Sequence, residues 1–133
     1  VLYTQPIVAA TASVDTGPAR EVLVRLAGDD GAPIAPSEFL KAAERYRLMS
    51  LVDRWVVQTA LAALGRGAIR LAGSRSMSIN ISGQTLGDAQ FLEFVVECLD
   101  RTGVAPSQVC FEVTEAAVVA NLDHARRFIG VLH

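Results

Sequence analysis

The chain has 133 residues, the length of one small domain, and 51% of them are apolar, which is enough for a sizeable core. Its formal net charge of −2 and its lack of a basic stripe give no support for binding a nucleic-acid polymer through the phosphates. No apolar run approaches the roughly 20 residues of a membrane-spanning helix, so no membrane segment is predicted in this chain.

The first predicted elements are two strands joined as a hairpin. Alternating apolar residues predict strands over residues 1–10 and 21–26, and residues 11–19 contain the glycine and proline of a turn. About ten residues between two strands are too few for a helical crossover. The two strands are therefore expected to run antiparallel.

Two helices are predicted next. Residues 28–36 are expected to form a loop, and a helix is expected to begin near Ser37. Ser50 and Asp53 have the spacing of a capping box, the arrangement in which a helix start is satisfied by two side chains. This spacing predicts a second helix over residues 51–64.

The rest of the chain alternates between strands and helices. The pattern predicts a strand over residues 76–82, a helix that is capped by Asp88 and runs to about Thr102, a strand over 109–114 and a helix over about 121–132. Such alternation is typical of a parallel α/β sheet with helices outside. The predicted fold class is therefore α/β.

Polar side chains lie at alternate positions of three predicted strands. The other positions form apolar faces that are expected to pack under the helices: Val22, Val24 and Leu26; Met77, Ile79 and Ile81; and Val109, Phe111 and Val113. The polar faces of the strands present Glu21, Asn80 and Glu112, whose oxygen atoms suit Mg²⁺ or Mn²⁺. Burying an unpaired carboxylate costs several kcal/mol, and a bound cation would explain why these groups face inward. A half-exposed sheet whose polar face lies in water gives the same alternation, so the pattern alone leaves both interpretations open.

The chain contains two cysteines, Cys98 and Cys110, and they lack the Cys-x-x-Cys spacing of a redox or metal site. Both are therefore predicted to be reduced residues of the core. A reducing compartment is expected for such residues, which predicts a cytoplasmic protein.

Several short motifs follow one another in an order that covers nearly the whole chain. These are "YTQPIV", "EVLVR", "PSEFLKAAERYRLM", "LVDRWVV", "INIS" and "FEVTE". With these motifs the chain resembles the first half of the EAL domain, the cyclic di-GMP phosphodiesterase family. Two positions depart from the family pattern, since Val22 stands where alanine is commoner and Arg47 where glycine is usual.

The resemblance implies a fold and an activity. The family's fold is a modified TIM (β/α)8 barrel whose first strand is antiparallel, and this chain would supply about the first half, with four strands. Residues 1–133 would then form a partial EAL domain. The family binds cyclic di-GMP and hydrolyses it to pGpG with Mg²⁺ or Mn²⁺.

The resemblance also implies roles for individual residues. The predicted metal ligands are Glu21, Asn80 and Glu112. The predicted ligand contacts are Gln5, Leu23 and Arg25. Catalytic roles fall to Glu21 and to Glu115, which would anchor a mobile loop of the active site.

The family's second half carries an aspartate pair, a lysine and further polar residues that this chain does not contain. The 133 residues alone are therefore expected to be inactive, although an intact domain would be an enzyme. The alternative is a degenerate EAL domain that acts as a cyclic di-GMP sensor or a protein-interaction module. Tandem architectures in the family suggest an upstream GGDEF or sensor domain, and the open edges of a half barrel favour a homodimer.

Overall fold

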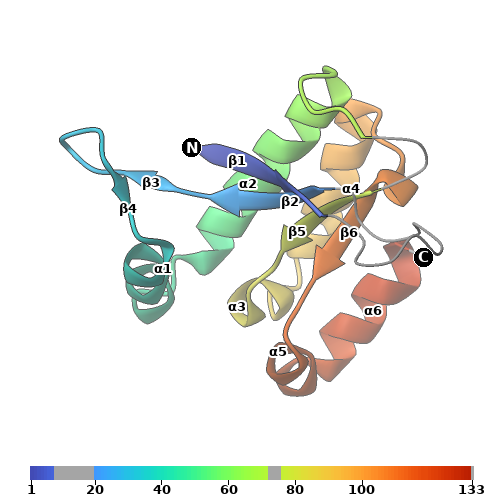
Figure 1. The fold of residues 1–133 in the computed structure, drawn as a ribbon. Coiled ribbons are helices and arrows are strands. Elements are labelled where there is room, and N and C mark those ends of the chain that lie inside the picture. The colour runs from blue at the N-terminus through green and yellow to red at the C-terminus, as the bar shows by residue number, and fades with distance from the viewer. Residues whose placement is uncertain (8–19, 72–75, 133) are drawn as a thin grey trace.

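The computed structural model describes residues 1–7, 20–71 and 76–132. Its main sheet has four strands in the order β1-β2-β5-β6 (Figure 1). Their bounds are Leu2–Pro6 for β1, Arg20–Val24 for β2, Met77–Asn80 for β5 and Val109–Glu112 for β6. β1 runs antiparallel to β2, and β2, β5 and β6 are parallel to one another. The predicted hairpin and the parallel α/β sheet are confirmed, whereas the turn over 11–19 lies outside the described residues.

Six helices occupy the described ranges. Their bounds are Pro36–Arg45 for α1, Met49–Gly65 for α2, Gly83–Leu86 for α3, Phe91–Thr102 for α4, Glu115–Ala120 for α5 and Leu122–Leu132 for α6, with a 3-10 turn over Pro106–Gln108. Helices α2 and α4 pack against each other on one side of the sheet (Figure 1). Helices α3 and α5 contact each other beyond the C-terminal ends of β5 and β6.

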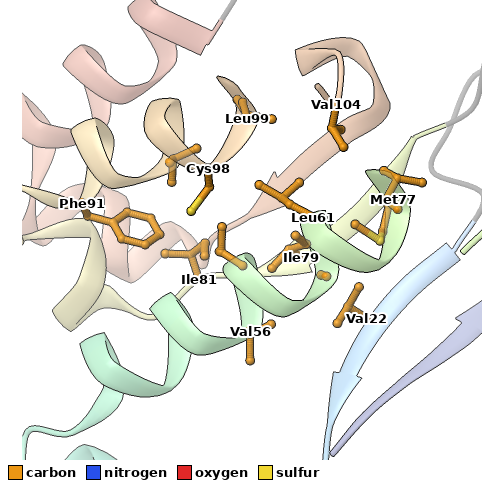
Figure 2. Packing of buried hydrophobic residues seen from close by; sticks show 14 residues of the cluster. Val22, Val56, Leu61, Met77, Ile79, Ile81, Phe91, Cys98, Leu99 and Val104 are labelled. Carbon is orange, nitrogen blue, oxygen red and sulfur yellow. The ribbon is translucent and has the colours of Figure 1, made fainter. Parts of the chain in front are cut away.

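The core lies between the sheet and helices α2 and α4. Figure 2 shows side chains from the two layers meeting, among them Val22 and Ile79 of the sheet and Leu61 and Phe91 of the helices. Strands β5 and β6 present an apolar face that carries Met77, Ile79, Val109 and Phe111, and packing against the helices removes this face from water. This arrangement confirms the predicted apolar faces of β2 and β5.

Two residues expected on the buried faces are exposed. Leu26 is 47% exposed and Val113 is 37% exposed. Leu26 lies outside β2, in the two-residue strand β3 (Leu26–Ala27), which pairs with β4 (Pro33–Ile34) as a separate ribbon. The predicted loop over 28–36 therefore contains a strand, and Val113 follows the end of β6 rather than lying within it.

The predicted capping box is wrong. Helix α2 begins at Met49, after Leu48, and no side chain caps its first turn. Asp53 instead points inward and accepts hydrogen bonds from Ser82 and Thr85. The reason is tertiary, because these two donors approach α2 from another part of the chain.

Asp88 was predicted to cap helix α4, but the helix begins later, at Phe91, and Gln90 is its N-cap residue. The Asp88 carboxylate accepts a hydrogen bond from the Gln90 amide at 2.9 Å and so forms a turn ahead of the helix. The end of α4 is as predicted, since Gly103 follows it with a φ of 67°. Residues 121–132 were expected to be one helix, and α6 covers all but the first of them.

Helices α3 and α5, which have four and six residues, were not predicted from the sequence. Helices of this length do not complete the apolar period by which a helix is recognised. Their N-caps, Ser82 and Thr114, each accept a hydrogen bond from a backbone amide three residues ahead. These two caps were the signal available in the sequence.

Both cysteines are free thiols, as predicted; Cys98 is buried and Cys110 is half-buried. Within the described ranges, no helix combines the length and the apolar character that crossing a bilayer requires.

Candidate active site

Polar residues of the central strands lie on the face of the sheet opposite the core. Side chains alternate along β5, so the buried Ile79 is flanked by Ser78 and Asn80 on the other face. Asn80 Nδ2 donates a hydrogen bond to Glu21 Oε1 of β2 at 2.9 Å. Ser78 Oγ donates a hydrogen bond to Glu112 Oε1 of β6. The fold therefore brings polar groups from three strands to one face.

The two hydrogen bonds run diagonally across the strands. In the strand register, Ser78 lies beside Glu21, and Asn80 lies beside Glu112. The hydrogen bonds instead join Ser78 to Glu112 and Asn80 to Glu21. Each bond uses Oε1 of a carboxylate. The second oxygen of each carboxylate takes no part in these two bonds.

A cavity of about 490 Å³ opens at the C-terminal ends of β2, β5 and β6. Its lining includes Leu23, Arg25, Asn80, Asp53 and Glu112. In α/β barrels the catalytic groups lie at this end of the strands. The cavity is thus lined by two predicted ligand contacts, Leu23 and Arg25, and by two predicted metal ligands, Asn80 and Glu112.

Gln5 lies beside the same face. It is exposed and stands directly opposite Glu21 in the antiparallel β1–β2 pair. Side chains of directly opposite residues project to the same side of a sheet. Gln5 is therefore next to Glu21, as a residue that contacts the same ligand would need to be.

Both backbone polar groups of Arg25 are hydrogen-bonded to Val1. Its amide donates to the Val1 carbonyl at 2.9 Å, and the Val1 amino group donates to the Arg25 carbonyl at 2.8 Å. Arg25 Nη1 donates to the Val24 carbonyl at 2.9 Å. This bond holds one nitrogen of the Arg25 guanidinium against the end of β2, beside the cavity that Arg25 lines.

Glu115 lies at the rim of this arrangement. It is exposed and is the first residue of α5, directly after Thr114, which lines the cavity. The structure therefore does not bring Glu115 into contact with Glu21, Asn80 or Glu112. Its role in anchoring a loop stays a prediction.

Comparison with known protein families decides the assignment of the chain. The family model for the EAL domain matches residues 1–133. The chain belongs to the EAL domain family. The antiparallel first strand and the parallel strands that follow are the first part of that barrel-like fold.

Curated relatives of this EAL domain include two phosphodiesterases. The chain is 34% identical over 121 residues to the cyclic di-GMP phosphodiesterase PdeB of Shewanella oneidensis, covering 91% of this chain and 14% of the relative. It is 29% identical over 125 residues to the cyclic di-GMP phosphodiesterase PdeF of Escherichia coli, covering 94% of this chain and 16% of that protein. The chain thus spans a small part of either relative.

Solved EAL domains have the same fold. The FimX EAL domain of Pseudomonas aeruginosa, bound to c-di-GMP, superposes with a TM-score of 0.81 at 25% identity, covering 99% of this chain and 52% of that one. The Xanthomonas citri FimX EAL domain, in complex with c-diGMP, gives 0.73 at 26% identity, covering 85% of this chain and 44% of that one. The chain therefore spans about half the length of these solved domains.

The donor set of this EAL domain suits a hard divalent cation. Glu21 and Glu112 supply carboxylate oxygens and Asn80 an amide oxygen, the ligand types that Mg²⁺ and Mn²⁺ prefer. Among the described residues, no three His, Cys, Asp or Glu side chains form a group that could hold a metal ion. Mg²⁺ is commonly held by one or two carboxylates together with substrate phosphates and water, so the set fits such an ion.

Cys110 shares the polar face but does not add a charged ligand. Burial raises the pKa of its thiol, and the neighbouring Glu112 carboxylate raises it further. The neutral thiol is therefore favoured, and a neutral thiol is a poor ligand for hard cations.

Two buried polar residues beside the site were missed in the sequence analysis. Ser78, which is fully buried, was assigned no role, and Asp53 was assigned to a helix cap. Asp53 had a usable signal, because it lies at helical spacing from Val56, Val57 and Ala60 and so shares the buried stripe of α2. For Ser78 the strand alternation predicted the face but not the Glu112 partner.

Proposed function

We propose that this EAL domain binds cyclic di-GMP and, in the intact protein, hydrolyses it to pGpG with Mg²⁺ or Mn²⁺. The observation that carries the proposal is the 2.9 Å hydrogen bond from Asn80 to Glu21, two residues that are 59 positions apart in the chain. It joins the Glu21 carboxylate of β2 to the amide of Asn80, and Asn80 lines the same cavity as Arg25. The relatives named as cyclic di-GMP phosphodiesterases support the choice of substrate.

Each residue has a distinct task in the proposed reaction. Glu21, Asn80 and Glu112 would hold the cation, which when bound makes water more acidic and polarises phosphoryl oxygens. Arg25 would pair with a phosphate through its guanidinium. Gln5, which offers both a donor and an acceptor, would bind a guanine edge or a phosphate, with Leu23 as an apolar contact.

The test replaces Glu21, which supplies one of two carboxylates at the site. Glu21→Ala in the full-length protein is expected to lower pGpG production by at least about 100-fold, since the charge that holds the cation is lost. Chromatography of the products measures this. Glu97→Gln, an exposed carboxylate on α4, is the matched control and should retain normal turnover. Near-normal pGpG production by Glu21→Ala would refute the proposal.

A second candidate is a sensor that binds cyclic di-GMP without cleaving it. It is supported by the two FimX EAL domains similar to this chain, whose structures are described as complexes with c-di-GMP. Binding of cyclic di-GMP by calorimetry, without pGpG formation in either Mg²⁺ or Mn²⁺, would establish the sensor instead of the enzyme.

A further inference from the structure

Asp53 is a carboxylate buried in the core face of α2. It is 5% exposed, and its Oδ2 accepts hydrogen bonds from the Ser82 amide at 2.9 Å and from Thr85 Oγ1 at 2.6 Å. Burying a carboxylate is unfavourable by several kcal/mol unless hydrogen bonds compensate. An apolar residue would pack here without that penalty. We therefore attribute the presence of the carboxylate to its hydrogen bonds with the segment that contains Ser82 and Thr85.

That segment directly follows Asn80. Asn80 is the last residue of β5, and the next amide, of Ile81, donates to the Glu112 carbonyl at 2.8 Å. The amide after that, of Ser82, donates to Asp53. Two consecutive amides thus tie the chain leaving Asn80 to β6 on one side and to α2 on the other.

The hydroxyl groups of Ser82 and Thr85 add further hydrogen bonds within this segment. Ser82 Oγ lies 3.0 Å from Thr85 Oγ1 and also accepts from the Thr85 amide at 3.3 Å, which caps α3. Thr85 is fully buried, so its hydroxyl has no alternative partner in water. Removing the Asp53 acceptor would leave the Ser82 amide without its bond and would leave the Thr85 hydroxyl with the Ser82 hydroxyl as its remaining partner.

We propose that Asp53 is a positioning residue: it holds the segment after β5 so that the Asn80 amide stays beside Glu21. Asp53 acts through the Ser82 amide and contacts neither the cation nor the substrate in this role. The inference rests on the proposed function in so far as Asn80 is a metal ligand. Outer partners of metal ligands commonly change metal affinity by about 10- to 100-fold when removed.

The test measures Mn²⁺ affinity by calorimetry in the full-length protein. Asp53→Ala should weaken Mn²⁺ binding by about 10-fold or more, and Asp53→Asn, which keeps an acceptor oxygen, should restore it to within about 3-fold. Thr85→Val keeps the Ser82 bond and should weaken binding less than Asp53→Ala. Val57→Ala, equally buried on the same helix, is the matched control and should leave the affinity unchanged.

A second readout keeps the inference separate from the proposed function. Hydrogen–deuterium exchange at residues 80–82 should accelerate in Asp53→Ala but not in Val57→Ala. If Asn80→Ala binds Mn²⁺ as the unaltered protein does, the metal site is wrong, and the exchange result alone decides whether Asp53 positions the segment. Unchanged exchange in Asp53→Ala overturns the inference. So does unchanged Mn²⁺ affinity in Asp53→Ala when Asn80→Ala loses binding.

Discussion

At the scale of single residues, Arg47 shows a local conflict between residue type and backbone. Its φ is 55°, and among the described residues it is the only non-glycine residue with a positive φ. The conformation ends α1, since the Arg47 amide bonds to the Glu44 carbonyl and the Leu48 amide to the Ala43 carbonyl. Arg47, which stands where the family usually has glycine, thus adopts a backbone conformation that favours glycine.

Replacing Arg47 by glycine should stabilise the protein. Glycine adopts positive φ without the clash that a Cβ brings, so Arg47→Gly is expected to raise the free energy of unfolding by about 1 kcal/mol. Urea denaturation followed by circular dichroism measures the change. Arg47→Ala keeps the Cβ and serves as the control, and an equal gain in both variants would show that the backbone conformation is not the cause.

Arg25 should matter for ligand binding and Arg127 should not. Arg25 lines the cavity, whereas Arg127 joins α6 to α4 through an exposed ion pair with Glu93 at 2.5 Å. Arg25→Ala is expected to weaken cyclic di-GMP binding by about 10- to 100-fold, the effect of losing a charge-assisted hydrogen bond. Calorimetry in Ca²⁺, chosen to suppress turnover, compares it with Arg127→Ala. Equal losses in the two variants would argue against the proposed ligand site.

At the scale of elements, a charged contact fastens α2 to the start of α4. Arg54 Nη2 lies 2.8 Å from Asp88 Oδ2, and the guanidinium is 4.8 Å from the centre of the Phe94 ring. The hydrogen bond from Arg54 is the main cause that lowers the pKa of Asp88. The folded state therefore favours the ionised carboxylate.

This contact predicts a loss of stability in acid. Because the pKa of Asp88 is lower in the folded than in the unfolded protein, its contribution is present above about pH 4 and disappears as the pH falls through the folded value. Asp88→Asn should lower the free energy of unfolding by about 1 kcal/mol at pH 7, and the difference should vanish as the pH falls through the lowered pKa of Asp88 in the folded protein. Thermal unfolding across this range measures it. Asp100→Asn, an exposed site on α4, should show no such pH dependence, and the same dependence there would contradict the assignment.

At the scale of the whole molecule, the described sheet ends at β1 on one side and at β6 on the other. Beyond β6, a groove of about 640 Å³ is lined by apolar side chains that include Phe111, Phe128 and Leu132. Ile129 and Val131 of α6 are 55% and 56% exposed. Unpaired strand edges and exposed apolar side chains both favour association with another chain.

The 133-residue polypeptide by itself is therefore expected to self-associate, with a two-fold dimer as the simplest closed form. Sedimentation at micromolar concentration measures its state. Changing Ile129 and Val131 together to lysine should reduce association while the helical circular dichroism signal is kept. A stable, monodisperse monomer of the unaltered polypeptide would contradict this prediction.

The sequence by itself determined the strand faces and most of the large elements. Alternation of side chains along a strand is a local property, so the placement of Ile79 on one face and Asn80 on the other followed from their order in the chain. The hairpin likewise followed from the short connection between β1 and β2. The motif order further indicated which polar residues share the site.

Only the tertiary structure decided the partners of buried polar groups. Asp53 was expected to cap its own helix, but it binds Ser82 and Thr85, which are 29 and 32 residues away in the chain. The partner of Ser78, Glu112, is 34 residues away. A hydrogen bond depends on distance and angle between groups brought together by packing of the helices on the sheet, and no local pattern of residues encodes that geometry.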